Sequence, residues 1–342
     1  MLFPSWLGLL TLLSVQLWQP GNQQPQQAVP WSLLTSVQAP YQLCALLPHL
    51  KDTYWLSVHA GMVEQAQALG VGLITMEAGG YDHQATQLAQ LARCRQQGSD
   101  AVLLGSVRYR LAEEIKIAAQ QLPVIAVVNE VEPGYLAGLV GASWYQVGVN
   151  LAQVINQKPG HQTLVLMFGP SERGGNRFIE QGLRDTLNPE AKILAKLHGE
   201  NSLAVQRRLL RRYLAQSEPP DWLLCGALCA ESAMSEPLLE AHGTHILSSY
   251  LSHSTYQGLR FDRLAFSNDD QMRTQGRLAV DLALRALQGE SLPAAMGPPL
   301  RGLTPGNLSP ARQRQVEQQS LSPPDFQAQF QLAPRVTPAA NR

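Results

Sequence analysis

The most informative part of the chain is Lys51-Asp-Thr-Tyr-Trp-Leu-Ser-Val-His-Ala-Gly61, which links an apolar run at Leu43–Leu47 to a segment of helical periodicity ending near Leu69. We interpret the apolar run as a strand and the later segment as a helix. Tyr54 and Trp55 therefore lie where a first strand turns into a first helix. In an open parallel sheet, this turn is at the end that binds ligands. Two bulky aromatic residues there predict a cage for a guest that is apolar, cationic or both.

Strand-like and helix-like segments alternate along most of the chain. The segments expected to be strands are Gln42–Leu47, Val71–Glu77, Ala101–Gly105, Val124–Asn129, Thr163–Gly169, Lys192–Leu197, Trp222–Gly226, Ile246–Ser249 and Leu264–Ser267. Longer segments with helical periodicity separate them. This order predicts an α/β fold in which parallel sheets carry helices on both faces.

The alternation falls into two similar halves, from about Gln42 to Gly141 and from about Thr163 to Ser249. Each half is long enough to form a doubly wound lobe. We expect the extra strand and helix at Leu264–Gln288 to return to the first lobe, and a ligand cleft to lie between the lobes. The predicted organisation is an N-terminal lobe of residues 41–144 plus 267–292 and a C-terminal lobe of residues 145–266 plus 293–320.

The composition changes at both ends of the chain. Leu7–Trp18 is largely apolar and is followed by a segment rich in Gln and Pro, which is typical of a signal peptide. No Lys or Arg precedes the run and no small-x-small cleavage site is clear, so a short membrane anchor is the alternative for residues 1–25. The run is shorter than the roughly 20 residues of a spanning helix, which favours export. Residues 321–342 are expected to be a loosely held tail.

The overall composition is that of a globular protein. Of the 342 residues, 45% are hydrophobic and 15% charged, and the formal net charge is zero. A nucleic-acid surface would need clustered Lys and Arg, and the one basic run, Arg207–Arg212, is expected on a solvated helix face. The sequence has no G-x-S-x-G or H-E-x-x-H motif. We therefore expect a protein without enzymatic activity, without a cofactor and without a nucleic-acid partner.

The four cysteines form two pairs in the sequence. Cys44 lies in the first strand and Cys94 near the end of the second helical segment. In an oxidising compartment they can form a disulfide, and otherwise both are small buried core residues, so two interpretations stay open. Cys225 and Cys229 have no further soft metal ligands nearby. We interpret them as core cysteines of a strand and the turn after it.

Further aromatic residues occur at the turns that follow other strands. Tyr81 ends the turn Ala78–Tyr81, Trp144 lies between the two halves, and Tyr250 and Tyr256 share a loop in the second half. Ring faces attract a methylated ammonium, and Tyr and Trp side chains add hydrogen-bond donors. We predict a ligand-binding cage of Tyr54, Trp55, Tyr81, Trp144 and Tyr250, with Asp52 beside it. Ordinary core packing is the alternative for these rings, and Asp52 has three open roles: facing the ligand, capping the helix or contacting a partner.

Two polar segments after strands have plainer interpretations. Gly169-Pro-Ser-Glu-Arg-Gly-Gly-Asn176 matches neither the Walker pattern nor the G-x-G-x-x-G pattern. We interpret it as an ordinary connection between a strand and a helix. Asp269 and Asp270 are interpreted as caps of the helix that begins near Gln271.

The first turn, ahead of Gly61 and Gly70, and the later helix Ala279–Leu287 resemble the type I periplasmic binding protein superfamily. The resemblance implies two doubly wound parallel-sheet lobes with the ligand cleft between them. A closer resemblance is carried by the motifs Leu43-Cys-Ala-Leu, Lys51-Asp-Thr-Tyr-Trp-Leu-Ser, Glu77-Ala-Gly-Gly-Tyr, Ser248-Ser-Tyr-Leu-Ser-His and Asp270-Gln-Met. These motifs are similar to those of one branch, the periplasmic proteins that detect trimethylamine N-oxide together with a sensor histidine kinase.

The resemblance implies a periplasmic sensor of trimethylamine N-oxide that is not an enzyme. Its implied partner is the periplasmic domain of a membrane sensor histidine kinase in a two-component system that controls anaerobic N-oxide respiration. Its implied pocket is the same aromatic set, although Tyr256 shares the loop of Tyr250. Sugar receptors often place an Arg where we align Ile179 and an Asn where we align Ala227 or Leu228. The alternative function is a periplasmic receptor that delivers a sugar or quaternary amine to an ABC-type permease.

Overall fold

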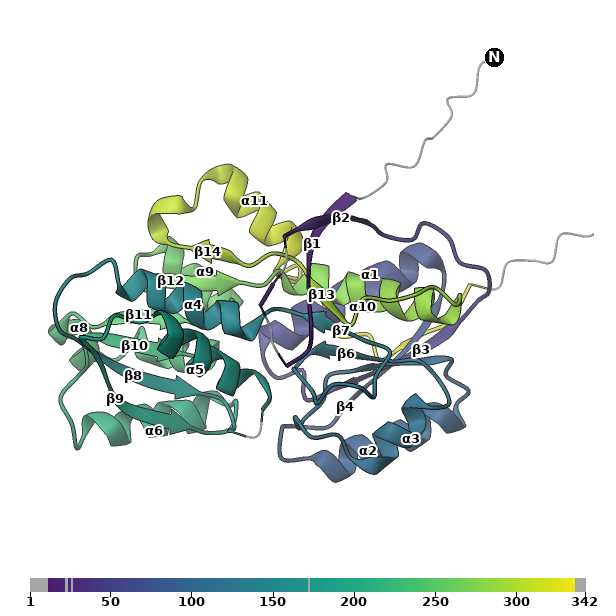
Figure 1. The fold of residues 1–342 in the computed structure, drawn as a ribbon, viewed down its shortest axis with the longest axis horizontal. Helices are drawn as coiled ribbons and strands as arrows, with labels where there is room; N and C mark the ends of the chain where they lie inside the picture. Colours follow the sequence, from purple (N-terminus) through teal and green to yellow (C-terminus); the bar gives the residue numbers. More distant parts are fainter. Residues whose placement is uncertain (1–11, 22–23, 26, 172, 336–342) are drawn as a thin grey trace, which may run out of the picture.

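The computed structural model describes residues 12–335 except 22–23, 26 and 172, and it forms two lobes side by side, each built on one sheet (Figure 1). In the larger sheet the strand order is β15-β4-β3-β5-β6-β7-β13-β1-β2. Its strands are β1 (Leu12–Trp18), β2 (Val29–Ser32), β3 (Gln42–Leu47), β4 (Gly72–Glu77), β5 (Ala101–Leu104), β6 (Val124–Val128), β7 (Gly138–Gly141), β13 (Ala295–Gly297) and β15 (Gln331–Leu332).

The smaller sheet has the order β14-β12-β11-β10-β8-β9. Its strands are β8 (Gln162–Phe168), β9 (Ala191–His198), β10 (Trp222–Cys225), β11 (His245–Ser248), β12 (Phe266–Asp269) and β14 (Arg301–Leu303). The helices are α1 (Thr53–Leu69), α2 (Gln84–Gln96), α3 (Glu113–Ala119), α4 (Trp144–Ile155), α5 (Gly175–Thr186), α6 (Leu203–Leu214), α7 (Ala227–Ala233), α8 (Pro237–His242), α9 (His253–Arg260), α10 (Met272–Leu287) and α11 (Pro310–Gln319).

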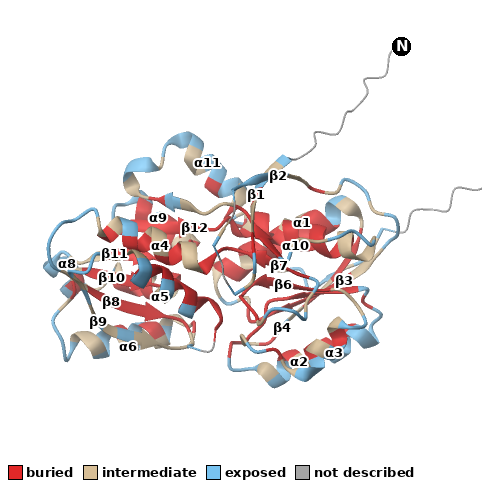
Figure 2. Cartoon of the chain, in the orientation of Figure 1, coloured by how far each residue is buried: buried red, intermediate tan, exposed pale blue. Residues whose placement is uncertain are grey.

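The central strands of both sheets are parallel, so the predicted α/β fold of two doubly wound lobes is confirmed. Parallel strands covered by helices on both faces need apolar residues on both faces. In β3, for example, every residue from Leu43 to Leu47 is buried. Figure 2 shows the central strands buried in both lobes, whereas β9 is partly exposed and α2, α3 and α6 each present an exposed outer side.

One pair of helices in each lobe crosses at glycines. A Cβ atom at Gly61 of α1 would lie 1.9 Å from a backbone oxygen of α10, and one at Gly276 of α10 would lie 2.0 Å from a backbone oxygen of α1. In the smaller lobe, Gly148 of α4 and Gly182 of α5 each leave 2.1 Å for such an atom. Any larger residue would force the two backbones apart, because protein interiors have almost no free volume.

The chain crosses between the lobes differently from the expected path. The predicted strand Leu264–Ser267 does not return to the first lobe, because β12 pairs with β11 in the smaller sheet. Only the following helix, α10, returns, and it packs against α1. β13 then joins the larger sheet beside β7, although residues 293–320 were expected in the C-terminal lobe. The limits of the two lobes otherwise stay a prediction.

The described part of the N-terminal apolar run, Leu12–Trp18, belongs to the larger sheet. β1 pairs with β13 and β2, and Val15 and Trp18 are buried. Behind β2, Trp31 Nε1 donates to the buried carboxylate of Asp281 at 2.9 Å, and Arg285 Nε donates to the same oxygen at 2.9 Å. Residues 12–18 are therefore a strand of the larger sheet, and the signal peptide or short anchor expected at residues 1–25 stays a prediction. The part of that prediction on residues 1–11 lies outside the described residues.

In the described part of the chain, no helix is both long enough and apolar enough to cross a membrane.

The segment after Ser320 is ordered as far as Arg335, so the expectation of a loosely held tail is wrong there. Ser322 N donates to Ser57 Oγ at 2.9 Å, and Gln329 N donates to His59 Nε2 at 3.1 Å. β15 then pairs antiparallel with β4. Main-chain groups of the segment make these hydrogen bonds, and the Pro- and Gln-rich sequence gave no sign of them. Residues 336–342 of the predicted tail lie outside the described residues.

The structure contains two disulfides. Cys44 in β3 is bonded to Cys94 in α2, which ties a covering helix to the centre of the larger sheet. Cys225 at the end of β10 is bonded to Cys229 in α7, where two separate core cysteines were expected. All four side chains are buried.

Candidate functional site

The five predicted cage residues come from both lobes and are all buried. Tyr54 and Trp55 lie in the first turn of α1, Tyr81 follows β4, and Trp144 opens α4, while Tyr250 follows β11. These positions are at the carboxyl ends of strands, where open parallel sheets bind ligands. The sequence-predicted residues therefore lie at the expected end of the sheets.

Asp52 fixes the start of α1. Its Oδ1 accepts a hydrogen bond from Trp55 N at 3.0 Å, and its backbone is extended, as an N-cap requires. Its Oδ2 lies 3.9 Å from His49 Nε2. Capping is therefore one role that the geometry assigns to Asp52. The carboxylate also lines a cavity between the lobes, so the cap does not exclude a role beside a ligand.

Four of the rings form a continuous cluster. The ring centroids of Tyr54 and Tyr250 are 4.9 Å apart in an edge-to-face contact, and those of Tyr54 and Trp55 are 6.0 Å apart. Trp55 Nε1 donates to the Tyr81 hydroxyl at 3.2 Å, which also accepts from Asn129 Nδ2 at 3.3 Å. The cluster therefore crosses the boundary between the lobes through Tyr54 and Tyr250.

Tyr256, the other aromatic residue of the Tyr250 loop, points elsewhere. Its hydroxyl donates to Glu317 Oε1 of α11 at 3.4 Å. The structure therefore brings Tyr250, and not Tyr256, against Tyr54.

Trp144 is fixed against the end of β6. Its Nε1 donates to the carbonyl of Val128 at 3.1 Å. Val128 has a φ of 66°, a left-handed conformation that is costly for a β-branched residue. Strained backbone of this kind is concentrated at functional sites, where the surrounding structure holds it in place.

Arg173 completes the cluster and was missed in the sequence. Its guanidinium carbon lies 4.7 Å from the Trp144 ring centroid and 5.7 Å from that of Tyr250, and the residue is only 7% exposed. Burial alone would lower the pKa of Arg173, but electrostatic interactions with Tyr81, Tyr250, Tyr54 and Asp52 together raise it. The guanidinium therefore lies among the predicted cage residues.

The loop that carries Arg173 is not the ordinary connection that we expected. A Cβ atom at Gly174 would lie 2.3 Å from the Glu130 carbonyl of the other lobe, and one at Gly175 would lie 2.9 Å from the Trp144 ring. Glycines let the backbone approach this closely. The sequence feature that could have indicated this site is Arg173-Gly-Gly175, in the loop that follows β8.

The N-cap residue of α10 is Gln271, and it makes no side-chain capping bond. Asp269 Oδ1 accepts a hydrogen bond from Gln271 N at 3.0 Å, so Asp269 does bind the start of the helix as expected. The other oxygen of Asp269 forms an ion pair with Arg301 at 2.6 Å. Asp270 accepts hydrogen bonds from the Tyr54 hydroxyl and from Gln275 Nε2. It lies where the chain passes from β12 of the smaller sheet to α10 of the larger lobe, so it links the ring cluster to a crossing between the lobes.

Burial keeps the tyrosines of the cluster neutral. It raises the pKa of Tyr54 well above the usual value, with a further contribution from the charge of Asp270. It also raises the pKa of Tyr81 and of Tyr250. Burial raises the pKa of Asp270 to about 6, although hydrogen bonds from Tyr54 and Gln275 oppose the shift. The hydroxyl groups are therefore donors at neutral pH.

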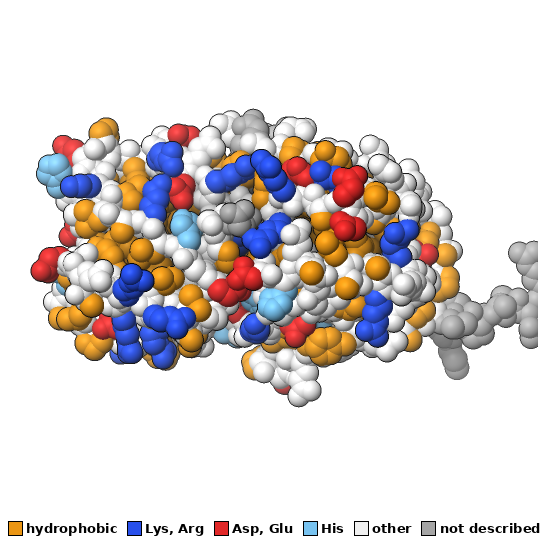
Figure 3. All heavy atoms as spheres, turned by 90° about the horizontal axis from the view of Figure 1, so that it is seen from below, with side chains coloured by type: hydrophobic (Ala, Val, Ile, Leu, Met, Phe, Trp, Pro, Cys, Tyr) orange, Lys and Arg blue, Asp and Glu red, His pale blue; other side chains and the backbone are white. Residues whose placement is uncertain are grey.

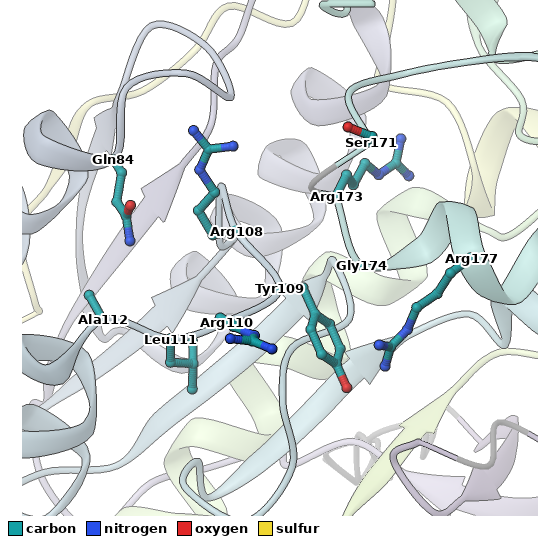
Figure 4. A pocket seen from close by; sticks show the side chains of 10 residues that line it. All are labelled: Gln84, Arg108, Tyr109, Arg110, Leu111, Ala112, Ser171, Arg173, Gly174 and Arg177. Carbon is teal, nitrogen blue, oxygen red and sulfur yellow. The ribbon is translucent and has the colours of Figure 1, made fainter. Parts of the chain in front are cut away.

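Two cavities lie beside the cluster. One of about 360 Å³ is lined from both lobes, by Asp52, Tyr54 and Tyr250 among others. The second, of about 440 Å³, is shown in Figure 4 and includes Arg173 at its edge. Four arginines line it: Arg108, Arg110, Arg173 and Arg177. Seen from below, the molecule carries Lys and Arg side chains on both lobes and near their boundary, with acidic side chains among them (Figure 3).

Within the described residues, no three His, Cys, Asp or Glu side chains are grouped to hold a metal ion.

The chain is similar to proteins of known family. The profile described as periplasmic binding proteins and sugar binding domain of LacI family matches residues 41–329. Periplasmic protein TorT of Escherichia coli K12 is 38% identical over 291 residues, which cover 84% of this chain and 83% of the relative.

Solved structures agree with this assignment. The complex of the TorS sensor domain with TorT in the absence of ligand matches with a TM-score of 0.74 and 32% identity, over 84% of this chain and 100% of that one. The complex in the presence of trimethylamine N-oxide matches with a TM-score of 0.73 and 32% identity, over 85% and 99% of the two chains. An ABC transporter solute binding protein from Bradyrhizobium sp. BTAi1 with bound bis-tris matches with a TM-score of 0.75 and 27% identity, over 93% and 97%. By sequence and by fold, the chain belongs to the periplasmic binding protein family, in the part of it represented by TorT, and is a periplasmic protein.

Proposed function

We propose that the chain binds trimethylamine N-oxide among the aromatic residues between its lobes, and that the bound state regulates a TorS-like membrane sensor histidine kinase. In this proposal the two-component system controls anaerobic N-oxide respiration. The observation that carries the proposal is the buried ring cluster of Tyr54, Trp55, Tyr81, Trp144 and Tyr250, built from both lobes. The likeness to TorT in complexes with the TorS sensor domain, without ligand and with the N-oxide, supports it.

The chemistry of the cluster suits a small methylated amine. Ring faces attract a diffuse positive charge that makes no strong hydrogen bonds, and methyl groups pack against them. The neutral hydroxyls and the Arg173 guanidinium are donors for an oxygen atom on the same ligand. A sugar in the cavity between the lobes would meet Ala227 and Leu228, both apolar, where sugar receptors often place an Asn. Each unmet buried hydroxyl costs roughly 1–3 kcal/mol.

Signalling requires that the ligand favour one arrangement of the lobes over another. Tyr54 contacts Tyr250 of the other lobe and donates to Asp270 at a crossing between the lobes. A guest among the rings therefore acts on the contacts that set how the lobes meet, and the surface offered to the kinase changes with them. The relatives are binding and sensing proteins, and we propose no enzymatic reaction.

Calorimetric titration of the purified protein with trimethylamine N-oxide tests the ligand. We expect saturable binding to one site and a rise in melting temperature with ligand concentration. The absence of both heat and thermal shift up to millimolar N-oxide would contradict the proposal. Co-purification with the periplasmic domain of a TorS-like kinase, with and without the N-oxide, tests the partner.

Delivery of a ligand to an ABC-type permease is the second candidate function. It is favoured by the likeness to the Bradyrhizobium solute binding protein, whose bound bis-tris is a hydroxylated tertiary amine. A ligand panel of the N-oxide, trimethylamine, betaine and ribose separates the candidates, because the sensor should prefer the N-oxide. Permease genes beside this gene would support delivery, whereas a histidine kinase gene would support sensing.

A further inference from the structure

Arg173 is a buried cation whose polar atoms are not satisfied by the described residues. Its Nε is buried without a hydrogen-bond partner. Its guanidinium group makes no ion pair and no hydrogen bond to any residue that the structure describes, and its contacts there are with the rings of Trp144 and Tyr250. Buried charges in proteins are nearly always paired or hydrogen-bonded. The Arg173 side chain therefore lacks a hydrogen-bond acceptor among the described residues, and a bound molecule has to supply one.

The ring contacts compensate the charge only in part. A guanidinium over an aromatic face is stabilised electrostatically. Its N–H donors, however, lie in the plane of the guanidinium and still need oxygen acceptors. Hydroxyl groups of Tyr54, Tyr81 and Tyr250 are close enough to influence Arg173 but form no hydrogen bond with it. An anionic oxygen on a bound ligand would complete the site.

We propose that Arg173 is the specificity-determining residue of this site and donates hydrogen bonds to an anionic oxygen carried by the methylated amine. The inference rests on the proposed function, since an N-oxide carries a negative oxygen directly on its positive nitrogen. A methylated cation without such an oxygen is repelled by the guanidinium, although the rings alone would accept it. The aromatic cluster thus selects the methyl groups and Arg173 selects the oxygen.

A different role would have the opposite consequence. If the guanidinium only filled the Trp144 face until a ligand displaced it, it would compete with every methylated amine. Removing it would then strengthen binding of the N-oxide, whereas an oxygen-binding Arg173 predicts weaker binding.

The test compares trimethylamine N-oxide with tetramethylammonium, which has nearly the same shape but a methyl group in place of the oxygen. Calorimetry on the full chain would use Arg173→Met, Arg173→Lys and the control Arg184→Met. Arg184 lies further along α5, is exposed, and pairs with Glu180 of the same helix at 3.4 Å. We expect Arg173→Met to weaken N-oxide binding on the order of 10- to 100-fold, as loss of charge-assisted hydrogen bonds does. The same variant should bind tetramethylammonium more tightly than the wild type does.

Thermal melts without ligand and with the N-oxide distinguish ligand binding from a merely structural role of Arg173. Arg173→Met removes an incompletely compensated buried charge, so its melting temperature should rise while the shift produced by the N-oxide shrinks. Arg173→Lys keeps the charge but loses the planar fork, and we expect intermediate N-oxide affinity. Arg184→Met should match the wild type in both measurements.

Unchanged or tighter N-oxide binding by Arg173→Met would overturn the role of Arg173 and leave the proposed function standing. The wild type could instead bind betaine and not the N-oxide, and Arg173→Met could lose betaine binding. That result would support oxygen binding by Arg173 and overturn the proposed ligand. Equal wild-type affinity for tetramethylammonium and the N-oxide would overturn the selection of an oxygen. A wild type that binds none of these ligands would overturn both proposals.

Discussion

The turns after the first central strand of each lobe contribute opposite chemistry to the proposed site. In the turn between β3 and α1, the side chain of Asp52 caps the helix, and the turn presents two aromatic rings. The turn between β8 and α5 has Gly174 at the N-cap with no side-chain capping bond, and it presents Arg173. The first turn is fixed by local hydrogen bonding, whereas the second depends on close approach to the other lobe. A site between two lobes can thus combine one turn that is fixed by its own hydrogen bonds with a second turn that is fixed only by contacts with the other lobe.

The largest expected effect is in the first turn, at Trp55. Trp55→Ala should abolish measurable N-oxide binding and lower the free energy of unfolding by about 3–5 kcal/mol, because a fully packed aromatic ring is removed. Calorimetry and urea unfolding measure the two losses. Phe261→Ala is the control, since its ring is 72% exposed. If Trp55→Ala bound the N-oxide like the wild type, the first turn would not contribute a wall of the site.

The next effect is on Asp270, which ties the first turn to the crossing between the lobes. Its pKa is raised to about 6 by burial, so the stabilisation from its protonated form is complete below its unfolded pKa and is lost as the pH rises through 6. Asp270→Asn should therefore gain on the order of 2–3 kcal/mol relative to the wild type between pH 4 and pH 8, at 1.36 kcal/mol per pKa unit.

Urea unfolding of both proteins across that pH range measures the difference. The subtraction removes the opposite contribution of His59, whose pKa burial lowers to about 4 and whose stabilisation is lost as the pH falls through 4. A constant difference between the two proteins across the range would contradict the assignment to Asp270.

A smaller effect is expected in the second turn, at Gly174. Gly174→Ala places a methyl group 2.3 Å from the Glu130 carbonyl, so the loop must shift and move Arg173. We expect a loss of about 1–3 kcal/mol in stability, as overpacking gives, together with weaker N-oxide binding. Gly306→Ala, where an added Cβ atom meets nothing closer than 4.0 Å, is the matched control. Equal behaviour of the two variants would show that the second turn needs no close approach.

The smallest effect is expected at the cap of the first turn. Asp52→Ala should cost about 1 kcal/mol of stability through loss of the N-cap, and Asp52→Asn should retain most of it. Thermal or urea unfolding measures both. If Asp52→Asn kept the stability but lost N-oxide binding, the carboxylate would face the ligand as well as cap the helix.

The sequence predicted the parts of the molecule that depend on residue pattern. Alternating strands and helices gave the two lobes, and aromatic residues after strands gave Tyr54, Trp55, Tyr81 and their partners. Arg173 was missed because its place depends on the space that Gly174 and Gly175 leave, and spacing along the chain does not reveal such space. The interpretation of Asp270 failed for a related reason, because its partner Tyr54 is 216 residues away.

The two edge strands of the larger sheet come from segments near the first and last described residues. β2 occupies one edge and β15 the other, and both pair antiparallel with their neighbours. Unprotected edge strands invite pairing between molecules and aggregation. The N- and C-terminal segments thus cover the backbone groups of the inner strands, and a shortened chain would expose them. A protein partner cannot extend this sheet at the paired residues of β4 without displacing β15.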